Sequence, residues 1–241
     1  MQRFFIADIH LNNNEPVITT GFLHFLNQLP AHCELYILGD LFDYWIGDDL
    51  ADELQQQIAS ALQQLTNRNI KSYFIHGNRD FLLGKHYAKI SHIQLLPDIC
   101  QLMHQQQNLI ILHGDQLCTD DLAYQQFRKK MHNKWLQKLF LVLPRFYRHK
   151  IANKLRNKSQ QHNQTKADYI MDVNQQTVET VMQNYQTTIM IHGHTHKPAT
   201  HQFQLNGKPA TRIVLGAWHD GINYIHQNEQ GELKLIQHAT H

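Results

Sequence analysis

Five short apolar segments, each ending in residues that can bind metal ions, constrain the fold of this 241-residue chain more than any other feature. Each segment has the length and the aliphatic and aromatic composition of a buried strand, and each stops abruptly at Asp, Asn or His. The segments are Phe4–His10, Leu35–Asp43, Tyr73–Asp80, Leu109–Asp115 and Ile189–His196. Because ligands of open α/β sheets bind outside the carboxyl ends of the strands, we expect these five ends to meet at one site.

The candidate ligands at the ends of the five segments are carboxylate, amide and imidazole groups, with no thiolate among them. They are Asp8, His10, Asp40, Asn78, His113, His194 and His196. This mixture of oxygen and nitrogen ligands suits manganese, zinc or iron. Seven ligands are too many for one ordinary ion, whereas two ions about 3.5–4 Å apart that share a bridging carboxylate would use them all. We expect Asp40 to be the bridge.

A single Asp or His at a strand end is more often a structural residue than a ligand. Five such ends in one chain favour the metal site over this structural alternative. His76 and His192 lie beside the motifs without belonging to the ligand set. Because side chains alternate along a strand, we expect these two to point away from the metals or to support the ligands from behind.

The order of the motifs resembles that of the calcineurin-like metallophosphoesterases, across almost the full chain. The motifs are Asp-x-His, Gly-Asp-x-x-Asp, Gly-Asn-x-Asp, His-Gly-Asp and Gly-His-Thr-His. The resemblance implies an α/β fold in one domain, built as a two-sheet sandwich flanked by helices. It also implies that the seven residues above hold two metal ions, and that water activated between these ions attacks phosphorus.

Helical periodicity predicts crossover helices over residues 15–29 and 48–66, and a further helix over residues 172–185. Three late segments alternate as strands do, and we expect them to complete the second sheet; they are residues 211–218, 222–227 and 232–238. The three cysteines are odd in number and far apart, so we expect reduced thiols in a cytoplasmic protein. No segment has the 18 or so apolar residues needed to cross a bilayer.

An inserted cap over residues 122–167 differs in charge from the rest of the chain. It contains no Asp or Glu but twelve of the chain's 22 basic residues, whereas the net charge of the whole chain is +2. Its pattern predicts two basic amphipathic helices broken at Pro144. Three interpretations are open: a solvated helical hairpin, a nucleic-acid groove, and a lid that binds an anionic lipid. We favour the lid because apolar residues cluster densely at the tip of the expected hairpin.

Arg79 distinguishes this chain from many calcineurin-like enzymes, which have a histidine at the corresponding position of the Gly-Asn-His motif. That histidine is thought to protonate a leaving alkoxide, and an arginine cannot act as an acid at neutral pH. We therefore expect a leaving group that needs no proton. The phosphate released from a diphosphate meets this requirement, and an arginine can stabilise its charge.

Longer segments resemble the UDP-2,3-diacylglucosamine diphosphatase family of the lipid A pathway; they are residues 36–42, 74–84, 113–121, 170–174 and 215–218. This resemblance implies a manganese-dependent attack of water on the α-phosphorus that yields UMP and 2,3-diacylglucosamine 1-phosphate. It implies a set of substrate contacts: Asn78, Arg79, Asp121, Ser159, Asn163, Lys166 and His194. It also implies catalytic roles for four residues, Asp40, Asn78, Arg79 and His194.

We therefore expect a lipid nucleotide as substrate and peripheral binding to the anionic cytoplasmic face of the inner membrane, with no nucleic-acid partner. Two alternatives are kept. The first is a nuclease or another two-metal phosphodiesterase of the same fold. The second is a basic scaffold protein that binds membranes and uses its metals for structure. The oligomeric state, the acyl-chain length and the groups that bind uracil stay open.

Overall fold

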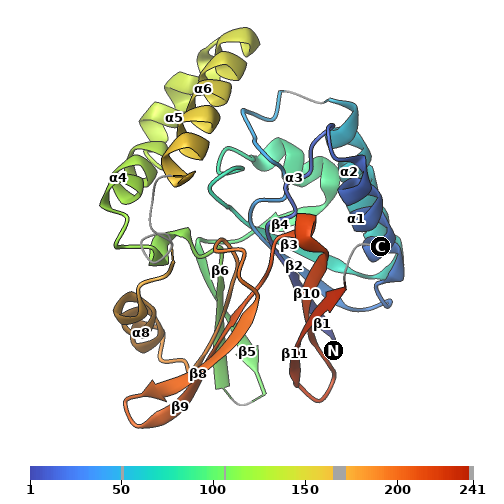
Figure 1. Cartoon of the computed structure of the whole chain (residues 1–241). Helices are drawn as coiled ribbons and strands as arrows, with labels where there is room; N and C mark the ends of the chain where they lie inside the picture. Colours follow the sequence, from blue (N-terminus) through green and yellow to red (C-terminus); the bar gives the residue numbers. More distant parts are fainter. Residues whose placement is uncertain (50–51, 106, 165–171, 239–241) are drawn as a thin grey trace.

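The computed structural model describes residues 1–49, 52–105, 107–164 and 172–238 of the chain. Two β-sheets pack face to face, helices cover their outer faces, and a group of helices projects beyond the sheets (Figure 1). Among the described residues, no helix combines the length and the hydropathy needed to cross a membrane.

The first sheet has, within the described residues, six strands in the order β11-β10-β1-β2-β3-β4. The bounds are β1 (Arg3–Ile6), β2 (Glu34–Leu38), β3 (Lys71–Ile75), β4 (Ile93–Leu95), β10 (Ile222–Gln227) and β11 (Leu233–His238). Strands β1 to β4 are parallel, and β10 pairs antiparallel with both β1 and β11. The carboxyl ends of β1, β2 and β3 therefore lie at the same edge.

The second sheet has the described strands in the order β5-β6-β7-β9-β8. The bounds are β5 (Ile99–His104), β6 (Gln107–Leu112), β7 (Ile189–His192), β8 (Ala199–Leu205) and β9 (Lys208–Val214). Strands β6, β7 and β9 are parallel, whereas the edge strands β5 and β8 are antiparallel to their neighbours. The two metal-bearing strands of this sheet, β6 and β7, therefore also end at one edge.

Three apolar clusters hold these layers together. Between the sheets, side chains such as Phe5 and Leu38 meet Ile111 and Ile191. On the outer face of the first sheet lie α1 (Pro16–Gln28), α2 (Glu53–Gln64) and α3 (Lys85–Ser91), and on that of the second lies α8 (Gln175–Asn184). Side-chain caps mark two of the starts, because Asp52 accepts a hydrogen bond from the backbone N–H of Gln55 and Asn174 accepts one from Thr177.

The cap contains α4 (Leu122–Met131), α5 (Lys134–Val142) and α6 (Arg145–Gln164), which project away from the sheets (Figure 1). The predicted break at Pro144 is confirmed, but the prediction of two helices is wrong because a second break occurs at Asn133. The Asn133 side chain caps α5 by accepting hydrogen bonds from the backbone N–H groups of Trp135 and Leu136. Such a side chain starts a new helix in place of continuing the old one.

The expectation that all three late segments complete the second sheet is wrong for two of them. Strand β9 does join that sheet, but β10 and β11 extend the first sheet beside β1. The alternation of polar and apolar residues predicts a strand correctly but does not say which sheet edge the strand will join. The α/β sandwich flanked by helices is confirmed.

Candidate metal centre

The carboxyl ends of five strands bring the predicted ligands to one place between the two sheets. Asp8 and His10 follow β1, Asp40 follows β2, Asn78 follows β3, His113 follows β6, and His194 and His196 follow β7. Two groups of these side chains have ligand atoms that all lie within 4.8 Å of one another, and both groups contain Asp8.

The first group consists of Asp8, His10 and His196. The Nε2 atoms of the two histidines are 3.3 Å apart. His196 Nε2 lies 3.4 Å from Asp8 Oδ1, and His10 Nε2 lies 4.0 Å from the same oxygen. One carboxylate oxygen and two imidazole nitrogens thus face a common point.

The second group consists of Asp8, Asp40 and His113. Asp40 Oδ1 lies 3.8 Å from His113 Nε2, and Asp40 Oδ2 lies 3.9 Å from His10 Nε2. Each oxygen of this carboxylate therefore faces a histidine of a different group. Asn78 completes the second group from the side, with its Oδ1 3.0 Å from His113 Nε2.

His194 and Arg79 approach the two groups from outside them. The His194 ring lies between two others, with its centroid 5.0 Å from that of His113 and 5.9 Å from that of Tyr124. Its backbone N–H donates a 2.8 Å hydrogen bond to Asp8 Oδ2. The backbone N–H of Arg79 likewise donates to Asp40 Oδ1 at 2.8 Å. Both backbone contacts hold a carboxylate that belongs to the centre.

Two features show that the centre fits metal cations. Asp8 Oδ1 is buried and has no hydrogen-bond partner among the described residues, which is costly for a carboxylate unless a cation lies nearby. His113 Nδ1 donates to the carbonyl of Leu38 at 2.8 Å, so in the neutral ring the Nε2 lone pair points at Asn78 Oδ1. Two acceptors at this distance need a proton or a metal ion between them. The donor set therefore fits divalent metals.

Burial and mutual charge set the ionisation of these groups. Burial, aided by Asp80 and Asp8, raises the pKa of Asp40 to about 7. Burial alone would raise the pKa of Asp8. The neighbouring His196, His113 and His10 have the larger combined effect, and they hold the pKa of Asp8 well below its usual range. Burial alone would lower the pKa of His113. The negative charges of Asp40, Asp8 and Asp115 outweigh burial and raise the pKa of His113 to about 9. The three carboxylates thus favour positive charge at His113, beside the point where cations would bind.

Two of the histidines are kept neutral by their surroundings. Desolvation is the main cause in both cases, and it lowers the pKa of His10 to about 3 and that of His194 to about 4. A neutral imidazole has a free lone pair, and a metal ligand must have one. These two side chains are therefore ready to bind a metal at neutral pH.

Five predicted ligands have left-handed backbone conformations. Their φ angles are 54° at Asp8, 54° at His10, 53° at Asp40, 72° at His194 and 57° at His196. Outside glycine this region is sparsely populated, although Asp and His tolerate it better than most residues. Such strain persists only where the surrounding structure enforces it, as it often does at functional sites. The core of the sandwich supplies that enforcement here.

Asp80 has a supporting role that the sequence analysis did not assign. Its two carboxylate oxygens accept backbone hydrogen bonds from Gly77, Asp40 and Leu41 at 2.9, 3.2 and 2.8 Å. Gly77 permits the close approach, because a Cβ there would lie 2.1 Å from Asp40 Oδ1. The signal that could have identified Asp80 was its place two residues after Asn78, within a motif already noted.

Of the predicted substrate contacts, Asp121 lies at the start of the cap. Its side chain accepts a 3.0 Å hydrogen bond from the backbone N–H of Tyr124 and so caps α4. Ser159 and Asn163 lie in the last part of α6, where only the backbone is described, and Lys166 lies outside the described residues. The roles of these four residues in binding substrate stay predictions.

Tyr124 is a further residue near the centre that the sequence did not single out. Its hydroxyl donates to Asp115 Oδ2 at 2.9 Å while its ring lies against that of His194. Arg128 Nε donates to the same carboxylate oxygen at 2.6 Å. Helix α4 of the cap is therefore tied to the loop that follows His113.

His76 and His192 belong to neither ligand group, and their ring nitrogens contact other protein groups. His76 Nε2 lies 2.7 Å from the carbonyl oxygen of Leu83. His192 Nδ1 lies 2.8 Å from the carbonyl oxygen of Gly193, and its Nε2 lies 3.0 Å from Arg212 Nη1. Both rings are therefore engaged by protein groups.

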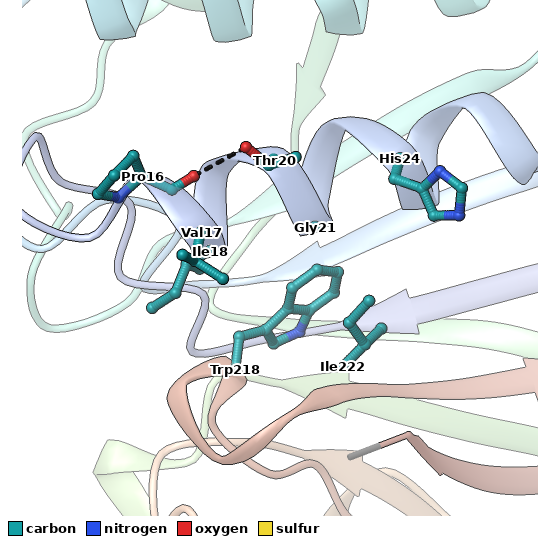
Figure 2. Close-up of a pocket in the computed structure, with 8 residues that line it drawn as sticks. All are labelled: Pro16, Val17, Ile18, Thr20, Gly21, His24, Trp218 and Ile222. Carbon is teal, nitrogen blue, oxygen red and sulfur yellow. Dashed lines mark hydrogen bonds between the residues drawn. The ribbon is translucent and has the colours of Figure 1, made fainter. Parts of the chain in front are cut away.

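A cavity of about 550 Å³ lies apart from the metal centre, between α1 and the short helix η3 (Trp218–Asp220) (Figure 2). Trp218 and Ile222 form one side, and Val17 and Gly21 of α1 form the other. None of the predicted site residues lines it. The chemistry suggested by the sequence is therefore located at the strand ends and not in this cavity.

Comparison with known families agrees with this geometry. The family model described as calcineurin-like phosphoesterase matches residues 1–198. The chain belongs to this family. It therefore shares the α/β sandwich and the metal-dependent phosphoester chemistry that the strand ends indicate.

Relatives of similar length match nearly the whole chain. A UDP-2,3-diacylglucosamine hydrolase of Proteus mirabilis (strain HI4320) is 54% identical over 220 residues, which cover 91% of this chain and 92% of the relative. One of Serratia proteamaculans (strain 568) is 56% identical over 220 residues, with the same coverage. One of Enterobacter sp. (strain 638) is 49% identical over 238 residues, which cover 98% of this chain and 99% of the relative.

Proposed function

We propose that this protein hydrolyses the diphosphate of UDP-2,3-diacylglucosamine, in lipid A synthesis, to UMP and 2,3-diacylglucosamine 1-phosphate. The observation that carries the proposal is the pair of ligand groups sharing Asp8, in a chain 54% identical to a UDP-2,3-diacylglucosamine hydrolase over 91% of its length. The reaction requires a cationic centre for a diphosphate, and this donor set supplies one. It requires no protein nucleophile.

Two divalent ions, which we infer to be manganese, would activate a water molecule for attack at the α-phosphorus and neutralise charge on the phosphoryl oxygens. Asp8, His10 and His196 would hold one ion. Asp40, Asn78, His113 and His194 would hold the other, and the two oxygens of Asp40 support its role as the bridge because they face histidines of both groups.

Arg79 suits the stabilisation of the phosphate that leaves the attacked phosphorus. The backbone N–H of Arg79 donates to Asp40 Oδ1, so the side chain of Arg79 leaves the main chain beside the centre. A guanidinium donates several hydrogen bonds in one plane and can bind two oxygens of a phosphate at once. We therefore assign Arg79 to the leaving phosphate, and His194 and Asn78 to orientation of the phosphoryl group.

The cap supports a lipid substrate because it exposes many large apolar side chains. Exposed residues of this kind are Leu122, Phe127, Trp135, Leu136, Leu139, Leu141, Val142, Phe146, Tyr147, Ile151 and Leu155. They are interleaved with exposed basic residues such as Lys134, Lys138 and Arg145. We propose that the apolar side chains receive the acyl chains. We further propose that the basic ones hold the protein at the anionic cytoplasmic face of the inner membrane.

A nuclease or another phosphodiesterase of the same fold is the alternative enzyme. The positive charge of the cap is compatible with nucleic acid. Exposed side chains such as Val142, at 82% of its maximal exposure, favour acyl chains over a phosphate backbone. Arg79 also fits a phosphate leaving group better than a basic alkoxide.

A direct comparison of substrates tests the proposal. Purified protein with manganese is given UDP-2,3-diacylglucosamine, single-stranded DNA or bis-p-nitrophenyl phosphate, and products are identified by mass spectrometry. We expect UMP from the lipid nucleotide at a kcat/KM far above that for the other two. Comparable rates on DNA or on the phosphodiester would contradict the proposal and favour the alternative.

The role of the cap is tested by charge insertion on its apolar face. Trp135→Asp and Phe140→Asp should raise the KM for the diacyl substrate and weaken binding to anionic vesicles. Val17→Asp is the matched control, because Val17 is also an exposed apolar residue but lies on α1. Unchanged kinetics in both cap variants would contradict an acyl-binding role.

A further inference from the structure

His192 is a buried histidine next to the metal ligands that takes no part in the two ligand groups. It is the last residue of β7, two positions before His194, and its relative exposure is 0%. Its Nδ1 contacts the carbonyl of Gly193 and its Nε2 contacts the guanidinium group of Arg212, at 2.8 and 3.0 Å. Both ring nitrogens thus have defined protein partners.

The contact with Arg212 fixes which ring nitrogen carries the proton. A guanidinium group has only donors, so Nε2 must accept from Arg212 and must be unprotonated. The proton of the neutral ring is then on Nδ1, which donates it to the carbonyl oxygen of Gly193. Without Arg212, the ring could adopt the other tautomer and this donation would be lost.

The carbonyl group that His192 holds belongs to the peptide unit joining Gly193 to His194. The N–H of the same unit donates to Asp8 Oδ2 at 2.8 Å. One flat peptide group is thus held at its oxygen by His192 and at its nitrogen by the carboxylate of Asp8. Because this contact occupies Oδ2, it leaves Asp8 Oδ1 to face His10 and His196.

Close packing leaves this peptide unit little freedom. A Cβ at Gly193 would lie 2.3 Å from Asp8 Oδ2 and 2.6 Å from the Cβ of Ala7. The backbone N–H of Gly193 also donates to the carbonyl of His113 at 2.8 Å. A rotation of the peptide unit would therefore move Asp8, or the start of the His194 backbone, or both.

Arg212 is a costly residue to bury. It lies on β9 beside β7, with a relative exposure of 7%, and its Nε has no hydrogen-bond partner among the described residues. Burial lowers its pKa, and the charge of Asp172 opposes that shift. A buried guanidinium is poor evidence for stability, since an apolar side chain would serve packing better. Its hydrogen bond to His192 gives it a role in positioning.

We propose that Arg212 and His192 are positioning residues of the metal centre: Arg212 fixes the tautomer of His192, and His192 holds the Gly193–His194 peptide unit in the orientation that Asp8 and His194 need. This inference rests on the metal centre of the proposed function and not on the identity of the substrate.

Manganese binding to the full chain, measured by isothermal titration calorimetry, tests the proposal without reference to activity. His192→Phe removes both contacts and should weaken Mn²⁺ binding about 10- to 100-fold, as is typical for residues that orient metal ligands. Arg212→Met should weaken it in the same direction, and Arg212→Lys, which keeps a donor, should recover part of the loss. His201→Phe is the matched control, because His201 is the exposed cross-strand partner of Arg212, and it should bind Mn²⁺ as the wild type does.

Wild-type Mn²⁺ affinity in folded His192→Phe or Arg212→Met would overturn the proposal, even if the melting temperature fell, because only a structural role would then remain. Should either variant not fold, ¹⁵N NMR of the histidine rings in the metal-free wild type decides. A proton on Nδ1 of His192 supports the proposal, and a proton on Nε2 overturns it. Wild-type protein that binds Mn²⁺ but leaves UDP-2,3-diacylglucosamine intact would refute the proposed function alone.

Discussion

The metal centre and the cap differ in the kind of residue that each buries or exposes. At the centre, charged and polar side chains such as Asp8, Asp40 and His113 are buried, and backbone groups from two sheets hold them in place. In the cap, apolar side chains such as Trp135 and Val142 are exposed to solvent. Each region thus reverses the usual distribution of polar and apolar residues.

This difference separates two tasks. Catalysis at phosphorus needs ligands fixed to a fraction of an ångström, and the sandwich provides this with short strands that end in strained, buried residues. Binding a lipid needs apolar surface that is accessible, and a helical insert can expose it without disturbing the core. We infer that the core determines the reaction and that the cap determines the substrate.

Removal of Asp40, the proposed bridging carboxylate, should have the largest effect. Asp40→Ala deletes the carboxylate that faces both ligand groups, and it should lower kcat by on the order of 10³-fold or more, because metal activation contributes several kcal/mol. Addition of a chelator to the wild type should have a similar effect, reversed by manganese. Activity that survives both treatments would contradict a metal-dependent core.

Two tryptophans allow the same substitution in the apolar core of the sandwich and in the cap. Trp218 is 2% exposed and packs edge-on against Phe22 and Phe25, whereas Trp135 is 81% exposed. Trp218→Ala should lower the free energy of unfolding by about 3–5 kcal/mol. Trp135→Ala should change it by less than about 0.5 kcal/mol while weakening vesicle binding. Equal losses of stability in urea titrations would refute the contrast.

A single methyl group should disturb the centre but not a surface helix. In Gly77→Ala the new Cβ would lie 2.1 Å from Asp40 Oδ1, and the resulting displacement should lower kcat about 10²-fold. In Gly21→Ala the Cβ would lie 3.7 Å from Ile222, an ordinary contact, so the activity should be unchanged. Full activity of Gly77→Ala would show that the centre tolerates more movement than we infer.

The smallest effect is expected where the cap meets the core. Arg148, a buried residue of α6, donates to the carbonyl of Ile46 at 2.7 Å and pairs with Asp49, whose pKa it lowers. Since the folded-state pKa of Asp49 is lowered, its contribution is present above the ordinary pKa of an aspartate, near pH 4, and is lost as the pH falls below it.

Asp49 is largely exposed, so Asp49→Asn should weaken docking of the cap by at most about 1 kcal/mol. Hydrogen exchange of the α6 backbone should report this change, with faster exchange in the variant at pH 7 and a difference that shrinks as the pH falls through the lowered pKa of Asp49. A difference that persists unchanged at low pH would show that the ion pair is not the cause.

The sequence was sufficient to predict the candidate ligands, because each is marked by its residue type and by its place at the end of an apolar strand. Apolar runs ending in Asp, Asn or His predicted the candidate ligands, and the structure brings these side chains together at the strand ends of the two sheets. Strand patterns could not show that β10 and β11 join the first sheet, because pairing of edges depends on contacts distant in sequence.

Supporting residues were harder to identify than the ligands. Asp80 acts through the backbone of Gly77 and Leu41, and Arg212 acts through His192. Asp80 lies in a motif already noted, but no pattern in the sequence shows that its carboxylate reaches Leu41, and Arg212 meets His192 only where β9 and β7 pair in the folded chain. Tyr124 became visible only when α4 was found against the ring of His194.

The most direct test of this account follows the oxygen atom of the attacking water. The protein, manganese and UDP-2,3-diacylglucosamine are incubated in oxygen-18 water, with Asp40→Ala as control, and both products are weighed by mass spectrometry. We predict that the label enters UMP and is absent in the control, which would establish attack at the α-phosphorus by the metal centre. Label in 2,3-diacylglucosamine 1-phosphate would contradict the assignment of Arg79 to the leaving phosphate, and no turnover would contradict the proposed function.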